Sequence, residues 1–363
     1  MSARHRRRPA TTVALAAALS AGVVLLISAC GPDEVGATGS TAGSPTAAAP
    51  RSTAPTAPAA PGKPSGKPTA PAGTPAAAKS SPPASGAPGT AGRGTANSPL
   101  TVSDGTSEVL MNGTSVDFHT QVRDLAWSSS GDQAAFVNSA GDLVVSKPDG
   151  SAQRVVAKNP GGQTWSHPTW QQSAADPGIG LPVRNNLFFT VDQAGTTHLA
   201  EVSATATDAT PTTLSLNAEL TDPPTTLPQT GNLWPDVAGP HGTAVYANGA
   251  DGHVYIRDEY TRQQGGVLTV GSEPALAPDE SAVAFVSSAN GHDHLFVLSL
   301  QSQGATPKDL TPNATTDYTE PAWSPDSKTI AVRTPDGVAT VPANGQGAPK
   351  LTVTTPGLPA YRP

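Results

Sequence analysis

Short runs of apolar residues alternate with polar turns through the last two thirds of the chain. Examples of such runs are 134–138, 143–145, 282–287 and 295–298, each followed by a turn that contains glycine, proline or aspartate. Short β-branched or aromatic runs bounded by turn residues are typical of antiparallel strands. No segment beyond the N-terminus shows a 3.6-residue period over three turns. The pattern therefore predicts an all-β fold.

A repeat of about 40 residues organises these runs. The segment 320–332, which begins Glu-Pro-Ala-Trp-Ser-Pro-Asp, has clear relatives at 273–285 and 124–136, and weaker copies begin at His167 and Trp234. Each repeat holds enough short runs for four strands. Four strands in about 40 residues are the signature of a β-propeller blade.

Each repeat also carries a large residue at one fixed position, followed by a tight polar turn. We expect these residues to pack between neighbouring blades as structural anchors, and a ligand role is the less favoured interpretation. The anchors are Trp127, Trp170, Val237, Leu276, Trp323 and Tyr361.

Both ends of the repeat region contribute to one further blade. The final segment, 357–363, repeats the start of the motif, whereas 100–102 and 108–110 resemble the outer strands of a blade. Joining them would close the ring and leave no open sheet edge. The sequence thus predicts six blades, with five or seven as alternatives. The second strand of the closing blade is not identifiable, so three strands are the alternative there.

The distance between Trp170 and Val237 is too long for one blade and too short for two. We attribute the excess to loop insertions at 171–184 and 217–231.

Three regions make up the predicted domain organisation: a signal peptide at 1–29, a linker at 30–99 and the propeller at 100–363. The signal has a basic start and a short apolar stretch, which is typical of export. It ends Ile27-Ser28-Ala29-Cys30, which resembles the bacterial lipobox, and Cys30 is the only cysteine. We expect Cys30 to be acylated (palmitate) and to hold the protein on the extracytoplasmic face of the cell membrane. A plain secretory signal is the alternative, and the export route, general secretory or twin-arginine, stays open.

The linker consists almost entirely of Ala, Pro, Ser, Thr and Gly. Such a segment cannot bury enough apolar surface to offset its ordering entropy, so the sequence predicts disorder. Its prolines favour an extended tether. Its Ser and Thr content is also compatible with O-glycosylation.

Charge narrows the choice of partners. The chain has 21 basic and 28 acidic residues, and nine basic but only two acidic ones precede residue 100. The propeller region therefore carries 12 basic and 26 acidic residues, a net charge of −14 with His neutral. An acidic surface disfavours nucleic acid and anionic lipid as partners.

Sequence motifs for chemistry are scarce. His292-Asp293-His294 is the one close ligand-like cluster, and an exposed polar turn is the favoured interpretation because zinc usually needs three or four convergent ligands. The pair Asp258-Glu259 is expected to be solvated. We find no nucleophile elbow, phosphate loop or His-Glu-x-x-His pair. The sequence predicts no enzyme activity and no cofactor, although propellers can assemble catalytic groups from several blades.

The motif Pro-Ala-Trp-Ser-Pro-Asp, followed by an apolar strand and a closing Leu-Thr, resembles the TolB-type, WD-repeat-like propeller family over most of 100–363. Together with the lipobox, the chain is similar to actinobacterial envelope lipoproteins, in particular to the propeller part of the LpqB family. The repeat architecture, the tether and the missing catalytic motifs favour a noncatalytic, membrane-anchored scaffold.

Three functions remain in competition. The favoured one is a monomeric scaffold that binds another envelope protein. The second is a surface hydrolase that acts on glycan or cell-wall material in the central pore, and convergent carboxylates there would support it. The third is a sensor for a small ligand or a metal.

Overall fold

The computed structural model describes residues 95–363 except 217–222, 260–264 and 303. The predicted signal peptide, the lipobox with Cys30, and nearly all of the predicted linker lie outside the described residues.

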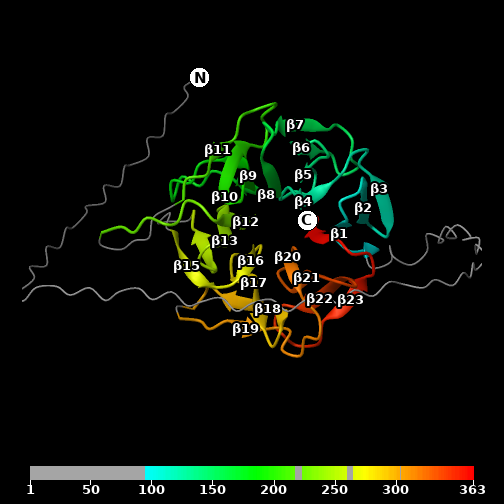
Figure 1. The fold of residues 1–363 in the computed structure, drawn as a ribbon, viewed down its shortest axis with the longest axis vertical. Coiled ribbons are helices and arrows are strands. Elements are labelled where there is room, and N and C mark those ends of the chain that lie inside the picture. Colours follow the sequence, from blue (N-terminus) through cyan, green and yellow to red (C-terminus); the bar gives the residue numbers. More distant parts are fainter. Residues whose placement is uncertain (1–94, 217–222, 260–264, 303) are drawn as a thin grey trace, which may run out of the picture. The chain divides into compact units, whose positions relative to one another are not determined.

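Six antiparallel sheets of four strands stand in a ring, which confirms the predicted β-propeller and its six blades (Figure 1). Five blades follow one another along the chain, each running from an innermost to an outermost strand. The first blade contains β4 (Arg123–Trp127), β5 (Ala134–Val137), β6 (Leu143–Ser146) and β7 (Arg154–Ala157). The second contains β8 (Thr164–Ser173), β9 (Arg184–Gln193), β10 (Thr196–Ser203) and β11 (Thr212–Thr213).

The next three blades have the same order. The third contains β12 (Asn232–Ala238), β13 (Thr243–Asn248), β14 (His253–Arg257) and β15 (Gly265–Val270). The fourth contains β16 (Ser272–Leu276), β17 (Ala282–Ala289), β18 (His292–Ser299) and β19 (Lys308–Asp309). The fifth contains β20 (Thr319–Trp323), β21 (Thr329–Thr334), β22 (Gly337–Pro342) and β23 (Lys350–Val353).

The sixth blade joins the two ends of the propeller, in the order β24 (Leu358–Tyr361), β1 (Leu100–Ser103), β2 (Glu108–Met111) and β3 (Thr114–Asp117). The alternative of three strands was wrong. The second strand of the blade is β1, which the sequence had assigned to the outer part, and the strand that the sequence missed is the outermost one, β3. It was missed because its residues, Thr-Ser-Val-Asp, are mostly exposed and form no apolar run.

The hydrophobic core lies between neighbouring blades. Of the six predicted anchors, Trp127, Trp170, Leu276 and Trp323 are buried, whereas Val237 and Tyr361 are half-buried. Two of the indoles also bond to the preceding blade. The Nε1 atom of Trp127 donates to Thr101 Oγ1 at 3.0 Å, and that of Trp323 donates to the Ala275 carbonyl at 2.9 Å.

A β-bulge interrupts the innermost strand at the same place in each of the first five blades. In every case the register shifts at a residue with positive φ, near 50°. These residues are Asp124, His167, Trp234, Glu273 and Glu320. The residue that follows is proline in all but the first blade. Proline fits there because an innermost strand is a sheet edge and a bulge leaves a backbone amide unpaired.

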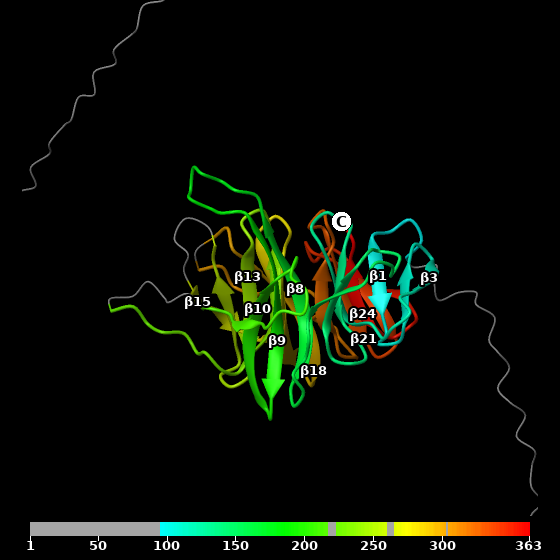
Figure 2. The same cartoon turned by 90° about the horizontal axis from the view of Figure 1, so that it is seen from above.

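The second blade is larger than the others. Strands β8 and β9 each contain 10 residues, so only residues 174–183 connect them, rather than the whole predicted insertion at 171–184. This connection projects beyond the ring (bright green, Figure 2). The other predicted insertion, 217–231, lies partly outside the described residues. In the part of the chain that the structure describes, no helix is long and apolar enough to cross a membrane.

Candidate functional site

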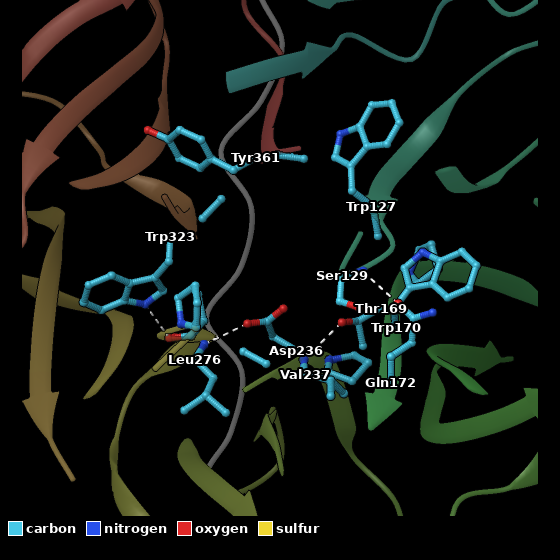
Figure 3. Close-up of a pocket in the computed structure, with 18 of the residues that line it drawn as sticks. Trp127, Ser129, Thr169, Trp170, Gln172, Asp236, Val237, Leu276, Trp323 and Tyr361 are labelled. Atoms are coloured by element: carbon cyan, nitrogen blue, oxygen red, sulfur yellow. Dashed lines mark hydrogen bonds between the residues drawn. The ribbon is translucent and has the colours of Figure 1, made fainter. Parts of the chain in front are cut away.

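A cavity of about 910 Å³ occupies the centre of the ring. All six innermost strands, β4, β8, β12, β16, β20 and β24, contribute to its lining (Figure 3). Because every blade contributes, the cavity is a property of the closed ring and of no single repeat.

The bulges determine which side chains line this cavity. Each bulge residue with positive φ belongs to the lining, so five blades place a polar or aromatic group there: Asp124, His167, Trp234, Glu273 and Glu320. In the sixth blade the equivalent residue is Leu358. The cavity therefore contains a ring of three carboxylates, one imidazole and one indole, which we call the polar ring.

Two carboxylates of the polar ring also hold neighbouring blades together. Asp124 Oδ2 accepts a hydrogen bond from the His167 amide at 3.2 Å. Glu273 Oε2 accepts one from the Glu320 amide at 2.6 Å. Each acceptor satisfies a bulge amide of the next blade, which would otherwise be costly to bury.

Asp236, next to the third bulge, makes a similar link. Its Oδ2 accepts a hydrogen bond from the Leu276 amide at 2.7 Å, across to the fourth blade (Figure 3). In the same region Thr169 Oγ1 accepts the Val237 amide at 3.0 Å. Side chains from consecutive blades thus bridge the innermost strands around the cavity.

His167 is the cationic candidate in the polar ring. Its Nε2 lies 3.3 Å from Glu320 Oε1, and its ring meets the Trp234 indole edge-on at a centroid distance of 6.1 Å. Its Nδ1 atom is buried and has no hydrogen-bond partner within the described residues. The imidazole is therefore only half satisfied.

Burial raises the pKa values of two carboxyl groups at this site to near neutral, and for Glu273 a neighbouring carboxylate adds to the effect. Burial, with a further contribution from the Glu320 charge, raises the pKa of Glu273 to about 7. Burial also raises the pKa of Asp236 to about 7. Burial opposes protonation of His167, but its hydrogen bond to Glu320 and the nearby carboxylates raise its pKa overall.

The predicted anchors all belong to the cavity lining as well as to the packing between blades. The polar ring, in contrast, was not predicted as a site. Its signal was present in the repeats, because the residue just before the proline of the motif is polar or aromatic in four copies: His167, Trp234, Glu273 and Glu320. Nothing in a single repeat shows that these positions face one another, because only ring closure brings them together.

The predicted cluster at His292-Asp293-His294 does not converge. These residues begin strand β18, so alternate side chains point to opposite faces. His292 lies 3.1 Å from Asp317, whereas His294 is entirely buried and its Nδ1 lies 2.8 Å from Asp309 Oδ2. The expectation of an exposed turn was thus wrong for His294. Within the described part of the chain, no group of three or more His, Cys, Asp or Glu residues is placed to hold a metal ion.

The expectation that the pair Asp258-Glu259 is solvated was wrong for Glu259. Its side chain is 3% exposed and lies between two arginines. Arg184 Nη2 approaches Glu259 Oε2 at 2.7 Å, and Arg257 Nη1 contacts Glu259 Oε1. Arg184 begins β9 and Glu259 follows β14, so this cluster joins the second and third blades. The contact with Arg184 was hidden from the sequence because Arg184 and Glu259 are more than 70 positions apart.

Strand order and ring closure define the chain as a six-bladed β-propeller. No protein-family model and no curated protein matches it. Among solved structures, it is similar to a TolB from Agrobacterium tumefaciens, at 16% identity over 71% of this chain and 89% of that one, with a TM-score of 0.47. It is similar to a puromycin-hydrolysing peptidase from Mycobacterium tuberculosis, at 13% identity over 74% of this chain and 48% of that one, with a TM-score of 0.42.

A further similarity is to a chain of a nidogen–laminin complex, at 11% identity over 73% of this chain and 97% of that one, with a TM-score of 0.48.

Proposed function

We propose that this protein is a noncatalytic scaffold of the cell envelope, anchored by a lipid on Cys30, whose propeller binds another protein at the central cavity. The observation that carries the proposal is the combination of a cavity of about 910 Å³ with the projecting β8–β9 connection at its border. Both features suit a partner segment that enters the ring and is held from one side.

The β8–β9 connection supports a protein partner. It carries one charged residue, Asp176, and it ends in Val183, which is 72% exposed and belongs to the cavity lining. An exposed aliphatic side chain at the border of a cavity is a favourable contact point for a partner. Three prolines also restrict the backbone where the cavity lining continues beyond the innermost strands. Pro240 follows β12, Pro278 follows β16 and Pro325 follows β20.

The proposed location comes from the N-terminus. The lipobox-like run that ends at Cys30, and the Pro/Ala-rich segment after it, would give a membrane anchor and a tether. The motif resemblance to LpqB-type lipoproteins belongs to this proposal. Replacing Cys30 by Ala should abolish incorporation of radiolabelled palmitate and move the protein from the membrane to the soluble fraction. Retention of the label in Cys30→Ala would contradict lipidation at this residue.

The partner is tested by chemical crosslinking on intact cells, followed by purification of the full chain. We expect a saturable crosslinked protein, which Val183→Asp reduces at least about tenfold. Val270→Asp is the matched control, because Val270 is 63% exposed on β15 and does not line the cavity. If no saturable partner appears, or if both variants behave alike, the proposal fails.

A second candidate function is hydrolysis of glycan or cell-wall material in the cavity. The convergence of Glu273 and Glu320 favours it, because a carboxyl with a pKa of about 7 beside a second carboxylate suits general acid–base chemistry. Peptidoglycan fragments incubated with the wild type and with Glu320→Gln would decide the matter. Release of new reducing ends by the wild type alone supports the hydrolase, and no release by either supports the scaffold.

A further inference from the structure

The polar ring presents hydrogen-bond acceptors without matching donors, and this defines a ligand. We propose that the central cavity binds an organic cation, a primary ammonium or a guanidinium group, between the carboxylates of Glu273 and Glu320 and the indole of Trp234. The site is independent of the protein partner proposed above, although a lysine or arginine of that partner would carry the same group.

Each carboxylate of the polar ring retains an oxygen that is available to a ligand. Asp124 and Glu273 each use one oxygen for a neighbouring amide, and Glu320 uses Oε1 for His167. Within the described residues, the structure gives no hydrogen bond to the remaining oxygens. Three half-used carboxylates around one cavity create a negative field in a region of low dielectric constant, which favours a cation.

His167 adds an acceptor that points to the same chemistry. In the neutral tautomer that donates from Nε2 to Glu320, Nδ1 carries a lone pair, and this atom is buried without a partner in the described part of the chain. A buried polar atom without a hydrogen-bond partner destabilises the folded protein. A ligand N–H would supply that partner.

The cavity contains no competing cation that is free to neutralise the carboxylates. Among the residues that line it, Arg184 is the one permanently charged cation, and its guanidinium bonds to Glu259 at 2.7 Å. The remaining basic group is His167. The lining thus holds four carboxyl groups, those of Asp124, Asp236, Glu273 and Glu320, and their excess of negative charge above neutral pH favours an added cation.

The geometry favours an organic cation over a metal ion. Among the described residues, no group of three or more His, Cys, Asp or Glu side chains is placed to hold a metal ion. Trp234 lines the cavity, and indole rings attract ammonium and guanidinium groups. The aliphatic walls, formed by Pro235, Pro274 and Pro321, suit the alkyl part of such a ligand.

Affinity should depend on pH through the groups that face one another. Asp124, Glu273 and Glu320 all act on His167. Asp293 acts on Glu273, and Asp236, whose pKa is also about 7, lines the same cavity. On acidification through neutral pH, Glu273 becomes neutral and His167 becomes positive, and both changes oppose a cation. Binding should therefore be tighter at pH 8.5 than at pH 6.

Isothermal titration calorimetry of the purified full chain tests the site. The probes are cadaverine, the peptide Gly-Gly-Lys-Gly-Gly, 1,5-pentanediol as a neutral isostere, and calcium chloride. We expect heat from the two amines and none from the diol. Glu320→Gln should weaken amine binding at least about tenfold. Glu108→Gln makes the same chemical change at an exposed position on β2 and should leave affinity unchanged.

A second variant guards against misfolding of the first. Trp234→Leu should weaken amine binding about threefold to tenfold through loss of the cation–π contact, with an unchanged far-ultraviolet spectrum. Tighter binding of the peptide than of cadaverine assigns the cation to a protein side chain, and the reverse assigns it to a free amine. Binding of calcium alone, equal binding of the diol, or amine affinity unchanged in Glu320→Gln would overturn the proposal.

The outcome is separable from that of the scaffold proposal. Amine binding without a crosslinked partner keeps the cation site and removes the scaffold. The opposite result is a crosslinked partner without amine binding. In that case the partner is lost in Val183→Asp and binds normally in Glu320→Gln, so the scaffold is kept and the cation site is removed.

Discussion

At the scale of single residues, this propeller buries charge where its sequence shows only scattered polar positions. Glu259 neutralises Arg184 and Arg257, and the Arg257 guanidinium also lies 5.7 Å from the centre of the Phe188 ring. Burial and the neighbouring Arg184 lower the pKa of Arg257 to about 10. The arrangement balances two desolvated cations against one carboxylate that both of them share.

Glu259→Gln should destabilise the protein by about 3–5 kcal/mol, because it leaves the buried Arg257 and the half-buried Arg184 guanidinium without their carboxylate. Lys158→Ala breaks an exposed pair with Asp208, whose atoms lie 3.3 Å apart, and should cost less than about 1 kcal/mol. Urea unfolding of both variants gives the comparison. Equal effects would show that the Glu259 cluster contributes no more than a surface pair.

Asp236 makes stability depend on pH. The pKa of an aspartate in an unfolded chain is near 3.8, and burial raises that of Asp236 to about 7 in the folded protein. The folded state therefore holds the proton more tightly, so its stabilising contribution is complete below about pH 4 and is lost as pH rises towards 7.

Asp236→Asn removes this dependence and keeps an oxygen that can accept the Leu276 amide. The fall in unfolding free energy between pH 5 and pH 7, measured in urea, should be smaller in the variant by about 2 kcal/mol. Glu108→Gln is the exposed control and should retain the slope of the wild type. A slope in Asp236→Asn that equals the wild-type slope would contradict the assignment.

At the scale of elements, glycine and proline control how strands meet. Gly337 begins β22 with φ of 138°, and a Cβ atom there would collide with the carbonyl oxygen of Val353. Gly291 has φ of 88° in the β17–β18 turn, and a Cβ atom there would meet nothing within 4 Å. The first glycine is required by packing, the second only by backbone conformation.

Gly337→Ala should therefore cost about 3 kcal/mol, from backbone strain and overpacking together. Gly291→Ala should cost about 1 kcal/mol, from the positive φ alone. The midpoints of urea unfolding measure both. Similar midpoints for the two variants would show that β22 and β23 separate readily.

At the scale of the whole molecule, one strand pair closes the ring. β24 pairs antiparallel with β1, with Leu100 opposite Tyr361. Beyond this pair, the Arg362 amide donates to the Pro99 carbonyl at 2.8 Å. Without β24, the edge of β1 would be open and the cavity would lose one of its six walls. Closure thus supports both the stability of the ring and the candidate site.

Removal of residues 358–363 should abolish cooperative unfolding and promote aggregation, because a free edge and the apolar faces beside it become exposed. A circular permutant supplies the control. Joining Pro363 to Thr95 through a short glycine linker, with new ends at Asn313, keeps β24 beside β1. It should unfold cooperatively, near the wild-type midpoint. Cooperative unfolding of the truncated chain would show that closure is dispensable.

The repeat was sufficient for the fold class and the anchor positions, and six blades were predicted only with the help of the two terminal segments, with five or seven as alternatives. Each blade is a local unit whose apolar runs and turns lie within about 40 residues, so its pattern can be recognised from the sequence. The outermost strand β3 was not predicted because it is polar, and an exposed edge strand needs no run of apolar residues.

What the sequence by itself determined is thus the repeating content of the blades: an anchor residue and the turns that bound the apolar runs. What only the tertiary structure decided is which residues from different blades meet. Glu259 meets Arg184, and Glu320 meets His167 from a position 153 residues away. The physical reason is that ring closure, rather than any local preference, brings these side chains together, so their burial and their pKa shifts arise only in the closed propeller.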